Sequence, residues 1–274
     1  MLVATLLALS SAGLHAAWNL VAKRSADPFL SLWGQFTMAG IVGIGVLAVT
    51  GGLPWLGWWL AALSGVVHLP YLAALAAVYA RGDFAVAYPL ARGAGALLAG
   101  LGGIFLLGDD LNGWSMTAIV TVTLGMALLS VGAVPAQIRT ALFVALTIGV
   151  YSTIDSHAAR EVEGNTYVFA MFAAAGICVT SYGTASGRAA AMVAAMRSSW
   201  RQFTLTGAMS VLTYALVLGA VRRAPVGYVA GLRESSILVA GFLGWRYLDE
   251  RHVRRRTIAA AVILAGLILL VLSG

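Results

Sequence analysis

The sequence predicts an all-α integral membrane protein with ten transmembrane helices. Of its 274 residues, 61% are hydrophobic and only 10% are charged, whereas a soluble domain carries roughly 25% charged residues. The mean hydropathy is +0.91. Ten apolar segments have the ~20 residues that a helix needs to cross a bilayer, and charged or turn-forming residues separate them.

The expected spans are helices and not barrel strands, because each is about twice as long as a tilted strand needs to be. The first span has no basic residues before it, which indicates an uncleaved helix and not a signal peptide. The longest connection, residues 185–201, is rich in Ala and Met and is compatible with a short interfacial helix. The ten spans are expected near 2–22, 28–50, 55–79, 84–107, 113–132, 139–157, 165–184, 202–221, 226–246 and 256–273.

Charge and motifs exclude several other classes of protein. The net charge is +7, but the basic residues lie in short loops without a basic face, so no nucleic-acid partner is expected. Cys178 is the single cysteine, so neither an intrachain disulfide nor a cysteine metal cluster can form. The sequence has no His-Glu-x-x-His, P-loop or nucleophile-elbow motif. We therefore expect no enzyme activity, no metal and no cofactor.

The second half of the chain repeats features of the first half at an offset of 141 residues. Because five is an odd number, a five-helix copy would enter the membrane upside down, as in the inverted repeats of secondary transporters. We therefore expect two halves, residues 1–137 and 138–274, with a substrate site between them near the midplane. The matched pairs include Arg81 and Arg222, Arg92 and Arg233, Leu97 and Leu238, Gly100 and Gly241, Gly103 and Gly244, Asp109 and Glu250, and Gly125 and Gly266.

The distribution of Lys and Arg predicts the orientation. The odd-numbered loops carry twelve basic residues, whereas the even-numbered loops carry only Arg160, Arg222 and Arg223. Basic residues favour the cytoplasmic side, so both termini are expected outside, in the periplasm, with the chain multi-pass in the inner (plasma) membrane. The sequence is compatible with a monomer and with a homodimer.

Four ionisable residues stand out within the expected spans, where each costs about 2.5–3.5 kcal/mol to insert. Arg92 and Arg233 each lie about eight residues into a helix, so they approach the midplane from opposite faces. They could bind a substrate carboxylate or phosphate, or be neutralised internally. Glu234 could bind an ammonium group, take up a proton or pair with an arginine. Asp155 and Asn19 lie late in their helices, which suits a gate or a helix cap.

Other polar and aromatic residues share the middle of the spans. His15 and His68 could titrate near neutral pH or simply form interhelical hydrogen bonds. Trp18 and Tyr88 are candidates for an aromatic pocket lining, and Tyr88 lies four residues before Arg92 on the same helix face. The predicted substrate-binding residues are therefore Arg92, Arg233, Glu234, Tyr88, Trp18, His15 and His68.

Three local motifs resemble the EamA family of the drug/metabolite transporter superfamily. They are His15-Ala-Ala-Trp-Asn19 in the first helix, Tyr88-Pro-Leu-Ala-Arg-Gly93 in the fourth, and Leu232-Arg-Glu-Ser235 with Asp249-Glu250 in and after the ninth. The resemblance implies a central cavity between two five-helix halves and alternating access, as in YddG-type exporters of amino acids and other metabolites. Two features depart from the family: the first helix has no glutamate, and the Lys/Arg count places both termini outside.

These observations predict a secondary transporter whose partners are a small-molecule substrate and the lipid bilayer. The leading interpretation is an exporter of amino acids. One alternative is a carrier of organic anions or sugar phosphates, which two arginines would suit. An alternative of another class is a membrane scaffold that transports nothing; a membrane enzyme is the third choice.

Overall fold

The computed structural model describes all residues except 24, 81–83, 163, 239–252 and 274. The fold is 88% helical, and the described residues contain no strand. The helices are α1 (Leu2–Lys23), α2 (Pro28–Thr50), α3 (Trp55–Ala80), α4 (Phe84–Leu107), α5 (Gly113–Leu129), α6 (Pro135–Glu161), α7 (Thr166–Ala185), α8 (Ala189–Val221), α9 (Val226–Arg233) and α11 (Val253–Ser273).

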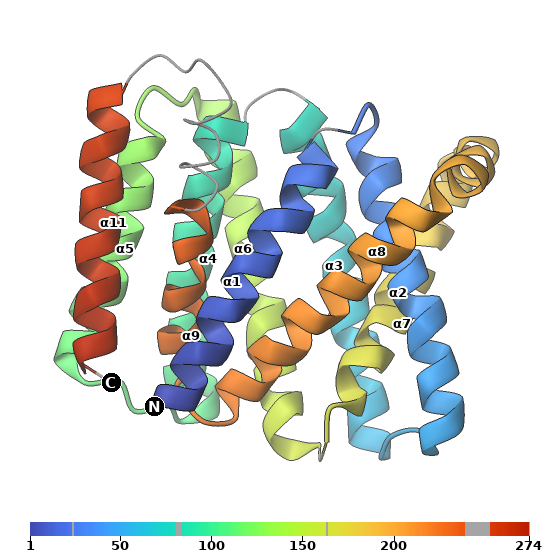
Figure 1. The fold of residues 1–274 in the computed structure, drawn as a ribbon, viewed down its shortest axis with the longest axis horizontal. Coiled ribbons are helices and arrows are strands. Elements are labelled where there is room, and N and C mark those ends of the chain that lie inside the picture. The colour runs from blue at the N-terminus through green and yellow to red at the C-terminus, as the bar shows by residue number, and fades with distance from the viewer. Residues whose placement is uncertain (24, 81–83, 163, 239–252, 274) are drawn as a thin grey trace.

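Among the described residues, six helices are long and apolar enough to cross a membrane. They are α2, α3, α4, α6, α7 and α8, while α1, α5 and α11 contribute shorter apolar stretches of 17 residues each. The helices run side by side as one bundle, and both ends of the chain lie on the same side of it (Figure 1). These features confirm an all-helical membrane protein; the inverted repeat of ten helices stays a prediction.

Local sequence sets where helices begin and end. Asp27 caps α2 by accepting a hydrogen bond from the Leu30 backbone N–H at 3.1 Å, and Pro28 occupies the first turn, where its missing N–H costs nothing. The helix ends at Gly51, whose φ of 83° lies in the left-handed region that glycine adopts without strain. The following chain can therefore turn back into α3.

Two expected elements differ from those observed. The expected interfacial helix in 185–201 and the span 202–221 form one helix, α8, with a kink at Ser199 (φ −128°, ψ 16°). The expected span 226–246 does not begin as one regular helix, because α9 ends at Arg233 after only eight residues. Residues 235–238 are helical again, so the interruption falls at Glu234.

The outer surface of the bundle is apolar, and its mostly apolar interior also holds polar and charged side chains. Val49, Phe105, Leu106 and Leu272 are between 75% and 88% exposed, as expected of side chains that face lipid. Trp55 and Trp114, at the start of α3 and α5, are exposed too, which suits anchors at the membrane surface. The buried polar residues include His15, His68, Arg92, Asp155, Arg233 and Glu234.

Helix packing follows a recurrent pattern between the two parts of the chain. The extensive contacts pair α4 with α6, α3 with α6 and α7, α1 with α8 and α9, α2 with α7 and α8, and α5 with α11. At the centre, α4 and α9 approach closely, because a Cβ atom on Gly227 would lie 3.0 Å from the Gly100 Cα. Two glycines therefore allow the backbones to meet, which brings the buried charges of both helices together.

Candidate functional site

The interruption at Glu234 places two charged side chains at the end of a short helix inside the bundle. The Glu234 backbone N–H donates to the Gly231 carbonyl at 3.1 Å, and the Ile237 N–H donates to the Glu234 carbonyl at 3.0 Å. These are tight turns between residues three apart, which mark a local change of helix geometry. In membrane transporters, interrupted helices of this kind commonly carry the substrate site.

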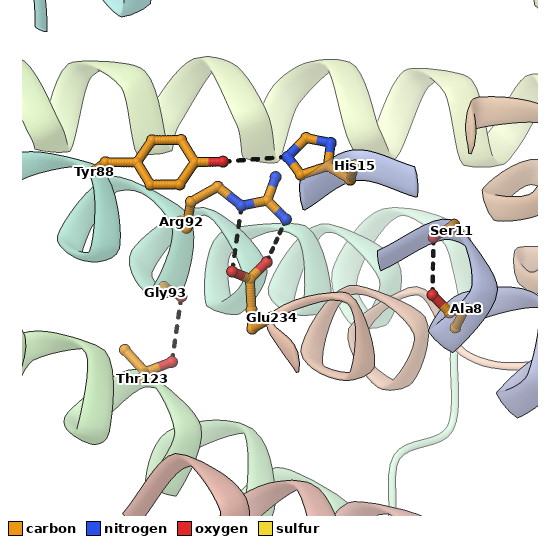
Figure 2. Close-up of polar contacts among 8 residues, drawn as sticks. All are labelled: Ala8, Ser11, His15, Tyr88, Arg92, Gly93, Thr123 and Glu234. Atoms are coloured by element: carbon orange, nitrogen blue, oxygen red, sulfur yellow. Dashed lines mark hydrogen bonds and ion pairs between the residues drawn. The ribbon is translucent and has the colours of Figure 1, made fainter. Parts of the chain in front are cut away.

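Arg92 and Glu234 form a buried ion pair that joins α4 to the end of α9. The Arg92 Nη2 lies 2.7 Å from Glu234 Oε1, and its Nε lies 3.2 Å from Oε2. Figure 2 shows the two parallel contacts. Both side chains are 3% exposed, so water barely screens the pair, and the bidentate geometry satisfies both charges. Of the predicted alternatives for Glu234, the structure therefore contains the pairing with an arginine.

A second contact lies beside this ion pair. His15 Nε2 of α1 is 3.2 Å from the Tyr88 hydroxyl of α4, and the Arg92 guanidinium lies between that contact and Glu234 in Figure 2. The His15 ring also meets the edge of Trp18, with ring centroids 4.7 Å apart. The interhelical hydrogen bond expected of a membrane histidine is thus present for His15, and five predicted site residues form one buried group.

Arg233 differs from Arg92 in having no hydrogen-bond or ion-pair partner within the described part of the chain. It is 8% exposed, and its Nε is buried without a hydrogen-bond acceptor among the described residues. Among the described residues, the indole N–H of Trp18 is the other buried side-chain donor without an acceptor. Unpaired buried donors are rare and costly, so these two atoms mark where a ligand would gain most from binding.

Asp155 lies in a separate buried cluster between α6, α7 and α8. Its Oδ1 accepts a hydrogen bond from the Tyr167 hydroxyl at 2.6 Å, and its Oδ2 accepts one from Tyr214. Asp155 is within α6 and is fully buried, so it caps no helix end. Its predicted function in a gate stays a prediction, and the side chain of its predicted counterpart, Asn19, lies outside the described residues.

His68 lies beside the Asp155 cluster and not against the ion pair. Its Nδ1 is 2.8 Å from the Ser64 carbonyl oxygen one turn earlier in α3. Its ring is 4.2 Å from Tyr151, which in turn is 5.3 Å from Tyr71, measured between ring centroids. Aromatic rings thus connect His68 to α6 and separate it from the group around Arg92.

A third polar network holds the ends of α4, α6, α8 and α9 together. Asp109 Oδ2 accepts a hydrogen bond from the Val226 N–H at 2.6 Å, so a carboxylate caps the positive end of α9. The other oxygen of Asp109 lies 2.7 Å from Arg160. Arg160 also donates to the Val221 carbonyl at the end of α8, at 3.0 Å, and Arg222 donates to the Ala159 carbonyl of α6.

Several residues of these buried polar networks were not predicted from the sequence. Tyr167 and Tyr214 lie 12 and 59 residues from Asp155 in the chain, and no sequence pattern links them. The partnership of Asp109 with the start of α9 spans 117 residues. A sequence signal did exist for Arg160 and Arg222, because they are basic residues on the side that is poor in basic residues.

Comparisons with known proteins now bear on the class of this bundle. Residues 137–272 match the sequence profile of the EamA-like transporter family. The C-terminal half of this chain is an EamA-like transporter domain. The EamA-like match supports a multi-pass membrane protein that transports small molecules, and it is consistent with a chain that is not an enzyme. The family prediction is thereby confirmed for this half; the amino-acid exporter subtype stays a prediction.

The fold of this chain also occurs among solved structures. A crystal structure described only as "Crystal structure of protein" is 22% identical and covers 99% of both chains, with a TM-score of 0.69. This likeness concerns the fold alone. No curated protein matches the sequence.

Proposed function

We propose that this chain is a secondary transporter that exports small metabolites, foremost amino acids, by alternating access across the inner membrane. The observation that carries the proposal is the group of three charged side chains buried at the interruption of α9. Three charged side chains at the centre of a bundle that faces lipid need a reason, because each is expensive to insert. The EamA-like domain supports transport as the reason for their presence.

The architecture proposed for this transporter is ten spans in two inverted halves, residues 1–137 and 138–274. Support comes from the packing, in which several of the extensive helix pairs have a counterpart five helices later in the chain. The contact of α3 with α6 corresponds to that of α8 with α1, and the contact of α3 with α7 corresponds to that of α8 with α2. Pairs such as α2 with α7 and α5 with α11 correspond to themselves, as helices beside a two-fold axis do.

Amino acids suit the charges of the proposed site. A zwitterion has one carboxylate and one ammonium group, and the centre offers two guanidiniums and one carboxylate. Arg233 is available for the substrate carboxylate, and Glu234 could receive the ammonium if its pair with Arg92 opens. Tyr88, His15 and Trp18 would line the same space. His68 would contact the substrate from the neighbouring aromatic cluster.

Alternating access requires contacts that break at one membrane face while the other face stays closed. The network of Asp109, Arg160 and Arg222 provides such contacts on the side where both termini lie. On the opposite side, Arg188 pairs with Asp27 and lies 4.5 Å from the centroid of the Phe29 ring. We propose that Asp155, midway between α7 and α8, belongs to the gate that moves with these helices.

The orientation proposed from the Lys/Arg count also gains a physical reason. The three arginines on the poorer side are all engaged: Arg160 with Asp109, Arg222 with backbone carbonyls of the α6–α7 connection, and Arg223 with the Gly219 carbonyl at 2.7 Å. Because these charges hold helix ends together, they count less as topological signals. The remaining asymmetry favours the termini outside still more strongly.

Counterflow in proteoliposomes tests the proposed function. Vesicles loaded with unlabelled leucine should accumulate labelled leucine when they contain the protein, and alanine or phenylalanine outside should compete. The control is the same lipid without protein. Uptake of labelled organic anions or sugar phosphates without amino acids would instead identify the anion carrier, which the excess of arginine over glutamate at the site favours as the second candidate. If neither class is taken up, the transport proposal is wrong.

A further inference from the structure

Two buried arginines, Arg92 and Arg233, differ in whether a neighbouring side chain neutralises them. The charge of Arg92 is cancelled by Glu234 through two contacts of 2.7 and 3.2 Å. The charge of Arg233 is cancelled by no contact among the described residues, and its buried Nε has no acceptor. A guanidinium has five N–H donors in a planar fork, which matches a carboxylate in geometry and in charge.

A second unpaired donor points to the same place. The indole N–H of Trp18 is buried and lacks an acceptor, although the residue is only 6% exposed. Elsewhere in the bundle, a buried tryptophan does find one, because the Trp33 indole N–H donates to the Thr180 hydroxyl at 2.9 Å. Trp18 and Arg233 belong to α1 and α9, which pack together. The ring of His15, also on α1, lies against Trp18.

The other anionic group of the interior is already engaged. Asp155 accepts hydrogen bonds from Tyr167 and Tyr214, and it forms no ion pair with Arg233 among the described residues. Arg92 and Glu234 together are neutral. The group of Arg92, Arg233 and Glu234 therefore carries one net positive charge, which one carboxylate would balance and a phosphate dianion would overbalance.

We infer that Arg233 is the subsite for a single carboxylate of the transported metabolite, that the indole N–H of Trp18 binds an acceptor of the same ligand, and that Arg92 serves to hold Glu234 and the end of α9 in place. This inference rests on the proposed function and narrows its substrate class to small monocarboxylates, amino acids included. It assigns different work to two residues that occupy matching positions of the repeat.

Ligand binding to the purified protein in detergent tests this assignment separately from transport. The probes form a matched set: leucine, its acid without the amine (4-methylpentanoate), its amine without the acid (isopentylamine), and glycerol phosphate. Thermal unfolding is followed through the one cysteine, Cys178, which is partly buried, with a thiol-reactive dye. We expect leucine and 4-methylpentanoate to raise the unfolding midpoint, and isopentylamine and glycerol phosphate to leave it unchanged.

Variants then assign the donors. Arg233→Met should abolish the carboxylate-dependent shift, and Arg233→Lys should restore part of it. Trp18→Phe should weaken the apparent affinity at least about tenfold, because it removes a hydrogen bond to a polar acceptor. Matched controls are Trp33→Phe, which loses an indole N–H elsewhere, and Arg197→Met, which loses an exposed arginine; neither should change ligand affinity.

Each outcome separates the two proposals. Carboxylates that bind through Arg233 but are never exchanged in counterflow would sustain the subsite and contradict the transport proposal. Exchange of leucine that is indifferent to Arg233→Lys and Trp18→Phe would sustain transport and overturn the subsite. The subsite is also overturned if isopentylamine raises the unfolding midpoint as much as leucine does. It is overturned as well if neither leucine nor 4-methylpentanoate raises the midpoint.

Discussion

Arg92 and Arg233 occupy matching places in the two halves of the sequence, yet their surroundings are opposite. Arg92 lies within a continuous helix and forms a bidentate pair with Glu234. Arg233 is the last residue of a helix that ends in the middle of the bundle, and its Nε has no partner among the described residues. The comparison indicates that the buried charge of Arg92 stabilises the fold, whereas we propose that the buried charge of Arg233 binds a ligand.

Removing Glu234 should have the largest effect on stability. Glu234→Ala leaves Arg92 buried without a counter-charge, and breaking such a pair from one side costs about 3–5 kcal/mol. We expect a large drop in the thermal unfolding midpoint, measured through the thiol of Cys178. The double variant Arg92→Met with Glu234→Met is the control, because it removes both charges and should recover most of the loss. A Glu234→Ala protein as stable as the wild type would contradict the pairing.

The Asp155 cluster extends the comparison to a buried carboxylate. Tyr214→Phe and Tyr167→Phe each remove one hydrogen bond to Asp155, and hydrogen bonds to a charged group contribute about 1.5–3 kcal/mol each. Both variants should lower the unfolding midpoint by similar amounts. Tyr182→Phe, at a tyrosine that is 44% exposed, should be neutral. If all three variants behave alike, the tyrosines do not stabilise Asp155.

Gly227 determines whether α9 comes close enough for Glu234 to reach Arg92. Gly227→Ala would place a methyl group 3.0 Å from the Gly100 Cα and 2.9 Å from a Leu111 methyl. We expect a loss of about 1–3 kcal/mol, as for other overpacked sites, together with weaker ligand binding because α9 is displaced. The matched control is Gly13→Ala, a helical position with nothing within 4 Å. Equal stability of the two variants would show that the close approach is unimportant.

Removing Arg233 should have the smallest effect on stability. Arg233→Met removes no ion pair among the described residues and removes a buried donor that has no acceptor. The free energy of unfolding should therefore stay within about 1 kcal/mol of the wild-type value or rise. The same assay as for Glu234→Ala allows direct comparison of the ion pair of Arg92 with the unpaired Arg233. A destabilisation as large as that of Glu234→Ala would mean that Arg233 has a structural function.

Much of the architecture follows from the sequence, because the apolar segments of membrane helices are long and the charged residues that separate them are few. The limits of α2 follow from Asp27, Pro28 and Gly51, which are local signals. The interruption at Glu234 was not predicted, since Leu232-Arg-Glu-Ser235 contains neither proline nor glycine. The contact found there is tertiary, namely the pair of Glu234 with Arg92 of α4.

The candidate site divides in the same way. Arg92, Arg233 and Glu234 could be singled out because charges are rare in membrane spans. Which arginine pairs with Glu234 depends on the packing of α4 against α9, and no spacing within the sequence encodes it. The tyrosines around Asp155 were missed because tyrosine is common near membrane surfaces and only the fold distinguishes a buried one.

The central claim is that the unpaired arginine at the end of α9 serves transport and the paired arginine serves the fold. Counterflow of labelled leucine by wild-type and Arg233→Met protein, each reconstituted in equal folded amounts, tests it most directly. The account predicts exchange by the wild type and near-complete loss in the folded variant. Exchange by Arg233→Met at the wild-type rate would contradict it.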